Sequence, residues 1–126
     1  MAHEKVSMLV ATLFLARDLA HREHLKVKGP GSYAAHNALA AFYDGIVDLA
    51  DSLAETYQGR FLVLLNIPLA GHDEGMSIAD TLAAQREWIR KARYEAIPRE
   101  ETPLQNIVDE IEALYMSTLY KLKFLA

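Results

Sequence analysis

The sequence predicts an all-α fold, an antiparallel four-helix bundle with a connector segment between the second and third helices. Four long segments place apolar residues at intervals of three and four, the period of an amphipathic helix. Short stretches that contain glycine, proline or polar residues separate the segments, and none of the four reads as a strand. The length of 126 residues suits one domain with its own core, so we expect a single helical domain over residues 1–126.

The first two predicted helices flank a break rich in glycine and proline. The first helix covers about Lys5–Lys26, and the break at residues 28–32 ends it. The second covers about Ser32–Gln58, with Ser32 as its N-cap and Gly59 as the residue that closes it. Its apolar residues recur in alternating fours and threes, a narrow seam that favours packing between nearly parallel helix axes.

Residues 60–75 form the least regular part of the chain. The apolar run from Phe61 to Leu65 suits either a short strand or a short helix. Because helices are predicted on both sides, we interpret this stretch as a connector that crosses the end of the bundle. Its length indicates a crossover rather than a tight turn.

The last two predicted helices begin with capping patterns. The third covers about Ser77–Glu95, with its first residue as the N-cap and an acidic residue at the third helical position. The fourth begins with Thr102 as the N-cap, Pro103 at the first helical position and Gln105 at the third. Each pattern predicts where a helix starts.

Composition excludes several classes of protein. The chain has no cysteine, so disulfides, thiolate nucleophiles and zinc ribbons are excluded. The formal net charge is −4 and there is no long cluster of lysine or arginine, so we expect no general affinity for nucleic acid. We find no signal peptide and no stretch of 18 apolar residues, and therefore expect a soluble, cytoplasmic protein that does not bind membranes.

Four residues form the candidate metal site: His24, His36, Asp51 and Glu55. A helix hairpin bent at the Gly-Pro-Gly break would bring the two histidines close together. Asp51 and Glu55 lie four residues apart, so they share one face of the second helix. However, His36 and Asp51 are separated by 15 residues, which is about 22 Å along a rigid helix. One chain therefore cannot bring all four residues to the same ion.

A homodimer through the second helix resolves this separation. If a two-fold axis passes near Tyr43 and Asp44, the two histidines face Asp51 and Glu55 of the second subunit, and two identical sites result. Imidazole together with carboxylate suits iron, manganese or zinc, and carboxylate-rich helical bundles are a known setting for iron.

Residues 24–36, HLKVKGPGSYAAH, followed by Asp51 and Glu55, resemble the signature of the Dps-type mini-ferritins, which are ferritin-like proteins. The resemblance covers roughly residues 20–58; beyond them only the order and lengths of the helices are similar. It implies a ferritin-like bundle that assembles into a shell and oxidises ferrous iron at sites between subunits. By position, His24 with Asp51 and Glu55 of the partner would hold the primary ion, and His36 would serve a weaker second position.

Two positions depart from the pattern of that family. Ala40 stands where the family usually has an aspartate ligand, and Leu25 stands where it usually has a tryptophan. The missing carboxylate weakens the case for two-metal chemistry. The case for a one-metal site is unaffected. The chain also lacks the lysine-rich N-terminal tail, so the resemblance does not extend to DNA binding.

Alternative interpretations remain open. The two histidines could simply cap the helix hairpin, and Asp44, Asp48, Asp51 and Glu55 could form a solvated acidic face. A second metal face could use His21 and His24, and residues 72–74 could be an exposed loop. The alternative function is a non-enzymatic, oligomeric structural or interaction protein that keeps the fold with degenerate metal sites, similar to short ferritin-like proteins encoded by tailed bacteriophages.

Overall fold

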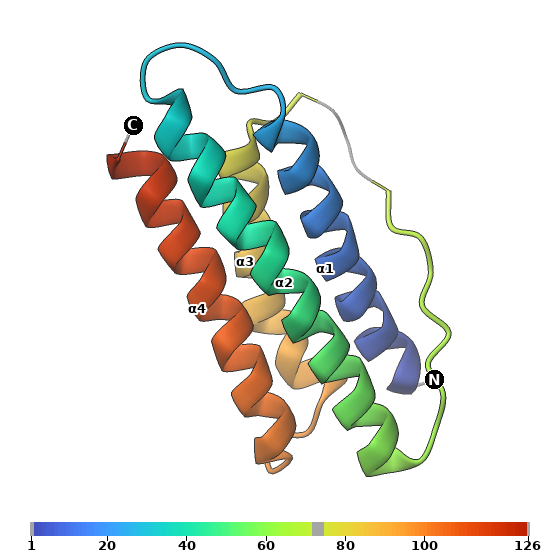
Figure 1. Ribbon diagram of the computed structural model, residues 1–126. Coiled ribbons are helices and arrows are strands. Elements are labelled where there is room, and N and C mark those ends of the chain that lie inside the picture. Colours follow the sequence, from blue (N-terminus) through green and yellow to red (C-terminus); the bar gives the residue numbers. More distant parts are fainter. Residues whose placement is uncertain (1, 72–74, 126) are drawn as a thin grey trace.

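The computed structural model describes residues 2–71 and 75–125, and over these residues the fold is a bundle of four α-helices without a strand (Figure 1). The helices are α1 (Ala2–His24), α2 (Ser32–Phe61), α3 (Ile78–Ala96) and α4 (Thr102–Phe124). The predicted fold class is confirmed. None of the four helices, as far as it is described, is long and apolar enough to cross a membrane.

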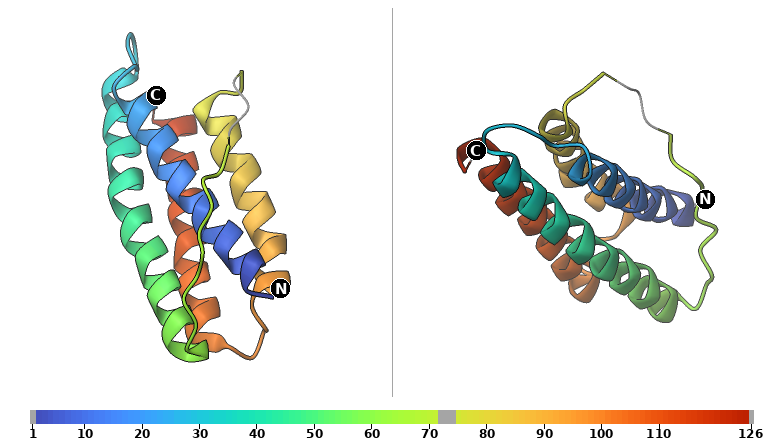
Figure 2. Two further views of the ribbon diagram at one scale, coloured as in Figure 1. Left: turned by 90° about the vertical axis from the view of Figure 1, so that its right-hand side faces the viewer. Right: turned by 45° about the horizontal axis from the view of Figure 1, so that its top comes forward.

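The helices pack as two antiparallel layers. α1 contacts α2 and α3, and α4 contacts the same two helices, so that α1 and α4 lie diagonally opposite each other. Figures 1 and 2 show that the helices in each contacting pair run in opposite directions, whereas α2 and α3 run in the same direction. This arrangement requires one long connection between α2 and α3, which is the connectivity of ferritin-like bundles.

The connection between α2 and α3, called here the crossover segment (residues 62–77), differs from the prediction in its path. Its first part, residues 62–71, does not cross the end of the bundle but runs along its length beside α1 (Figure 2). Residues 63–71 form neither a helix nor a strand. The lengthwise path follows from the topology, because the chain must return from the end of α2 to the start of α3 at the opposite end. The candidate loop at residues 72–74 lies outside the described residues.

Three predicted helix ends need correction. α2 has Gly31 rather than Ser32 as its N-cap, at a φ of 78° that glycine adopts readily. α2 also continues past Gly59 to Phe61, whose ring packs 4.7 Å from that of Tyr57. α4 has Glu101 as its N-cap in place of Thr102, without a side-chain capping bond.

One predicted helix start is confirmed, and the pattern predicted for α4 is shifted by one residue. The hydroxyl of Ser77 accepts a hydrogen bond from the Asp80 N–H at 3.1 Å, as an N-cap serine should. Because Glu101 is the N-cap, Pro103 is the second helical residue of α4 rather than the first, and Gln105 is the fourth rather than the third; Pro103 still lies in the first turn, where its missing N–H removes no helical hydrogen bond.

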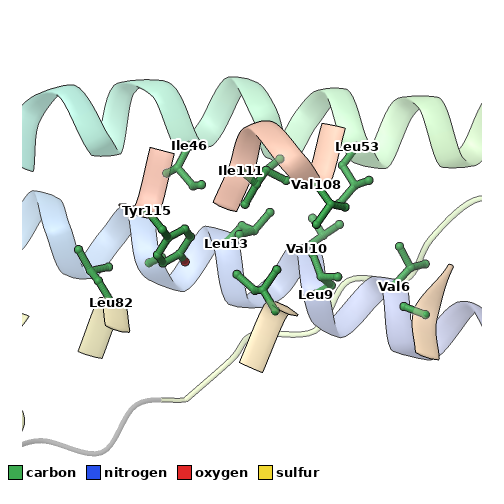
Figure 3. Packing of buried hydrophobic residues seen from close by; sticks show 14 of the residues in the cluster. Val6, Leu9, Val10, Leu13, Ile46, Leu53, Leu82, Val108, Ile111 and Tyr115 are labelled. Atoms are coloured by element: carbon green, nitrogen blue, oxygen red, sulfur yellow. The ribbon is translucent and has the colours of Figure 1, made fainter. Parts of the chain in front are cut away.

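The core is a continuous apolar cluster to which all four helices contribute (Figure 3). Tyr115 is fully buried in it, with its ring edge-on to Phe42 at 5.0 Å. Its hydroxyl donates a hydrogen bond to the side-chain oxygen of Gln85 at 2.9 Å, and burial raises the pKa of this phenol far above its usual value. The buried polar atom is therefore satisfied and uncharged.

A buried charge network joins α3 to α4. The Arg93 guanidinium donates to Glu112 at 2.7 Å and to the side chain and backbone of Gln105 at 2.8 and 2.7 Å. A further ion pair, 2.7 Å long, joins it to Asp109. Only 5% of the Arg93 side chain and 9% of that of Glu112 is exposed, against 63% for Asp109. The interaction with Glu112 is therefore screened much less than that with Asp109.

We predict that the buried and exposed partners of Arg93 differ in their contribution to stability. Glu112→Gln leaves the buried guanidinium of Arg93 short of its main counter-charge, also removes the ion pair of Glu112 with Arg86 at 3.3 Å, and should lower the free energy of unfolding by about 2–4 kcal/mol. Asp109→Asn removes the same charge at an exposed position and should cost less than about 1 kcal/mol. Urea unfolding of the two variants measures both values, and equal losses would show that burial of the pair does not matter.

Candidate metal site

The hairpin between α1 and α2 brings His24 and His36 into direct contact. α1 ends at His24, and the chain turns through Gly29 and Gly31, both of which have positive φ. α2 then begins, with His36 in its second turn. The two imidazole rings stack with their centroids 3.6 Å apart and an angle of 22° between their planes. The sequence-based expectation that the hairpin brings these two residues together is therefore confirmed, and they are called here the histidine pair.

Each ring of the histidine pair is bonded to the backbone of the other residue. Nδ1 of His24 lies 2.8 Å from the carbonyl oxygen of His36, and Nδ1 of His36 lies 2.9 Å from that of His24. A carbonyl oxygen only accepts, so both Nδ1 atoms carry a hydrogen. In the neutral rings the lone pair is then on Nε2, the atom that a metal would bind. A backbone carbonyl on the opposite nitrogen is a common way to orient a metal-binding histidine.

The histidine pair has aromatic neighbours that the sequence reasoning did not connect with it. The Tyr43 ring stacks on His21 at 4.3 Å and meets His24 edge-on at 5.3 Å. The sequence signal was available, because Tyr43 lies seven residues, or about two turns, after His36 on α2. Tyr43 therefore packs against α1 instead of lying only in a dimer contact. Stacking on Tyr43 also positions His21 beside the pair.

Asp51 and Glu55 lie far from the histidine pair in the same chain. Both side chains are exposed on α2, 15 and 19 residues after His36. Asp51 is about 22 Å further along the helix axis than His36 and about 60° around it, so the two occupy the same side of α2. Within the described residues no group of three or more histidine or acidic side chains could hold a metal ion. One chain thus keeps the histidine pair and these two carboxylates apart.

The carboxylates belong to a longer acidic row on α2, which we define as Asp44, Asp48, Asp51 and Glu55. All four are exposed, and across residues 2–71 and 75–125 none has an ion-pair partner. Acidic side chains three and four apart on a helix repel each other by a few tenths of a kcal/mol per pair. The row therefore has a net attraction for a cation or for a basic surface.

The opposite end of α2 has the complementary charge. Lys26 and Lys28 are exposed in the loop that precedes α2, next to the histidine pair. Lys26 makes one ion pair with Glu23, at 3.8 Å. The α1–α2 hairpin therefore carries imidazoles and ammonium groups at one end and carboxylates further along α2.

The observed geometry defines the class of protein as a four-helix bundle with one lengthwise crossover and a hairpin closed by two histidines. The chain belongs to DUF5856, a family of unknown function, whose profile matches residues 24–122. That range includes all four candidate ligands. No curated protein and no solved structure matches the chain significantly.

The histidine pair should also contribute to stability, and a conservative variant separates this contribution from metal binding. His36→Ala removes one hydrogen bond and the ring stack and should lower the free energy of unfolding by about 1–2 kcal/mol. His36→Asn retains a donor near the position of Nδ1 and should lose less than the alanine variant, although it lacks Nε2. Thermal and urea unfolding of both variants test this order, and equal losses would contradict a role for the Nδ1 bond.

Proposed function

We propose that this protein is an oligomeric, Dps-like member of the ferritin-like superfamily that binds ferrous iron between subunits. One observation carries the proposal: among the described residues, Nε2 of each ring in the histidine pair has no hydrogen-bond partner, and α2 also carries two exposed carboxylates, Asp51 and Glu55, without an ion-pair partner. The two halves of the site lie too far apart to act within one chain. Each half therefore needs its complement from a second copy.

A two-fold contact between two α2 helices supplies that complement. With the axis near Tyr43 and Asp44, antiparallel α2 helices place His36 of one copy opposite Asp51 of the other. The basic loop of each copy, with Lys26 and Lys28, then lies at the acidic end of the other α2. Opposite charges meet at both ends of the contact, which favours this orientation over the parallel one.

The ligands of such a site have the chemistry of a ferrous site. His24 would contribute a neutral nitrogen, and Asp51 and Glu55 of the second copy would contribute oxygens and negative charge. The carboxylates neutralise the cation, and the backbone carbonyl of His36 fixes the tautomer of His24. Iron is the substrate, and dioxygen or peroxide would accept its electron, which makes ferroxidase activity the proposed reaction. The same ligands also suit manganese and zinc.

Ala40 limits the proposed site to one strongly held ion. It lies one turn after His36, where a methyl group offers no oxygen to a second cation. His36 alone would hold that second position weakly. The proposed stoichiometry is therefore near one ion per chain.

The structural role of the histidine pair favours a second function. Each imidazole already caps a backbone carbonyl of the hairpin, so both residues have a structural role without any metal. Together with Ala40, this favours a non-enzymatic assembly or interaction protein that retains the fold. The two functions differ in whether Nε2 and the carboxylates bind iron.

Iron titration of matched variants separates these functions. Under anaerobic conditions the wild-type protein should bind about one ferrous ion per chain, and Asp51→Asn should weaken that binding at least tenfold because a charged ligand is lost. Asp48→Asn removes the same charge one turn away and should change the affinity much less. Isothermal titration calorimetry with ferrous iron measures each constant.

The outcome decides between the two functions. An absence of iron binding by the wild-type protein, or equal weakening in the two aspartate variants, would contradict the proposed site. The acidic row would then act as an interface or solvated face, as the second function requires.

A further inference from the structure

The crossover segment has two different faces along residues 63–67. Val63, Leu65 and Ile67 are half-buried and pack on the core. Leu64 and Asn66, which alternate with them, are exposed, and 89% of Leu64 is accessible to solvent. This alternation is that of a strand lying flat on an apolar surface. Figure 2 shows the segment passing over α1, with α2 on one side and α3 on the other.

The backbone of this strand-like stretch is almost unpaired. The Leu65 N–H donates to the side-chain oxygen of Gln58 on α2 at 2.9 Å. No other backbone group between Val63 and Gly71 has a hydrogen-bond partner among the described residues. In an extended chain, alternate residues direct their N–H and C=O groups to the same edge. Because Leu65 turns toward α2, the groups of Leu64 and Asn66 turn to the edge away from α2.

This free edge lacks the features that normally prevent strand pairing. Exposed edges are usually protected by charged side chains, yet the stretch from Phe61 to Gly71 contains no charged residue. Its one proline, Pro68, comes after the residues whose N–H groups form the edge. A strand without charges does not repel a second copy of itself.

We propose that the free edge of residues 64–66 pairs with the same edge of a second copy of this chain. Two identical strands related by a two-fold axis are antiparallel and therefore self-complementary. With the axis at Leu65, Leu64 of each copy lies opposite Asn66 of the other, and each of these pairs exchanges two N–H···O=C bonds. A second copy satisfies the edge completely without requiring any other protein.

The surroundings of the edge provide apolar surface for the same contact. A groove of about 540 Å³ opens between α1 and α3 beside the crossover segment, and its lining includes Met8, Leu69, Met76 and Trp88. All four are exposed large apolar side chains. A stable interface buries about 800 Å² per partner, more than a short strand edge supplies, so this surface has to contribute.

This contact is separate from the α2 contact of the proposed iron site. It uses the crossover segment and the α1–α3 groove, whereas the iron site uses the acidic row and the histidine pair. A chain with two different two-fold contacts assembles beyond a dimer. The inference therefore stands or falls independently of iron binding.

Two substitutions at one exposed position test the contact. Asn66→Pro deletes an N–H that has no hydrogen-bond partner among the described residues, so the fold should be retained while the pairing between copies is lost. Asn66→Ala keeps this N–H and is the matched control. By analytical ultracentrifugation we expect the mass of the assembly to fall by half in the proline variant only, with circular dichroism unchanged in both.

Amide exchange of the wild-type assembly gives an independent test. The amides of Leu64 and Asn66 should be protected, and those of Val63 and Ile67 on the other edge should exchange fast. The proposal is overturned if the amides of Leu64 and Asn66 exchange as fast as those of their neighbours. It is also overturned if the two Asn66 variants form assemblies of equal mass, or if the wild-type protein has the mass of one chain, 14.1 kDa.

Discussion

The rigid length of α2 is the constraint on which the candidate site depends. The helix runs without interruption from Ser32 to Phe61, so the distance between His36 near one end and Asp51 beyond its middle is set by helix geometry. No change of side-chain rotamer can bridge the distance of about 22 Å between these two residues. Any site that uses both residues therefore has to lie between two molecules, and metal binding and assembly become one question.

The contact between His24 and His36 closes the hairpin and has two physical consequences. Reciprocal hydrogen bonds to the two backbone carbonyls hold the end of α1 against the start of α2. The same bonds fix both imidazoles in the tautomer that leaves Nε2 available. A structural role and a ligand role therefore use different nitrogens of the same ring and are compatible. Only a measurement that leaves the Nδ1 hydrogen bond intact can distinguish the ligand role from the structural role.

Much of the fold could be predicted from the sequence because its signals are local. Periodic apolar residues located four helices, and the Ser77 cap was placed correctly because its hydroxyl bonds to the nearby Asp80 N–H. Gly59 was misread as a helix end because α2 continues to Phe61, whose ring packs on the core and lies 6.4 Å from that of His3 on α1, and this packing depends on tertiary structure. The lengthwise path of the crossover segment also depends on the relative directions of α2 and α3, which no local pattern specifies.

The candidate site could be predicted in part. The hairpin break was sufficient to predict the contact between His24 and His36, because the two residues lie close to the same turn. Their reciprocal bonds to the backbone and the stacking of Tyr43 on His21 were missed, since both depend on the angle at which α1 meets α2. The pairing with Asp51 and Glu55 of another copy stays a prediction, because its geometry belongs to an assembly.

The central claim, that the histidines and the carboxylates of one site come from different chains, is tested most directly by mixing two inactive variants. One variant combines His24→Ala with His36→Ala, and the other combines Asp51→Asn with Glu55→Gln. Each alone should bind no iron at the site. In a mixed dimer, the intact histidines of the second variant lie opposite the intact carboxylates of the first. One of the two sites is then complete and should bind ferrous iron again. If the purified mixed dimer binds no more iron than either variant alone, the site does not form between chains and the account is wrong.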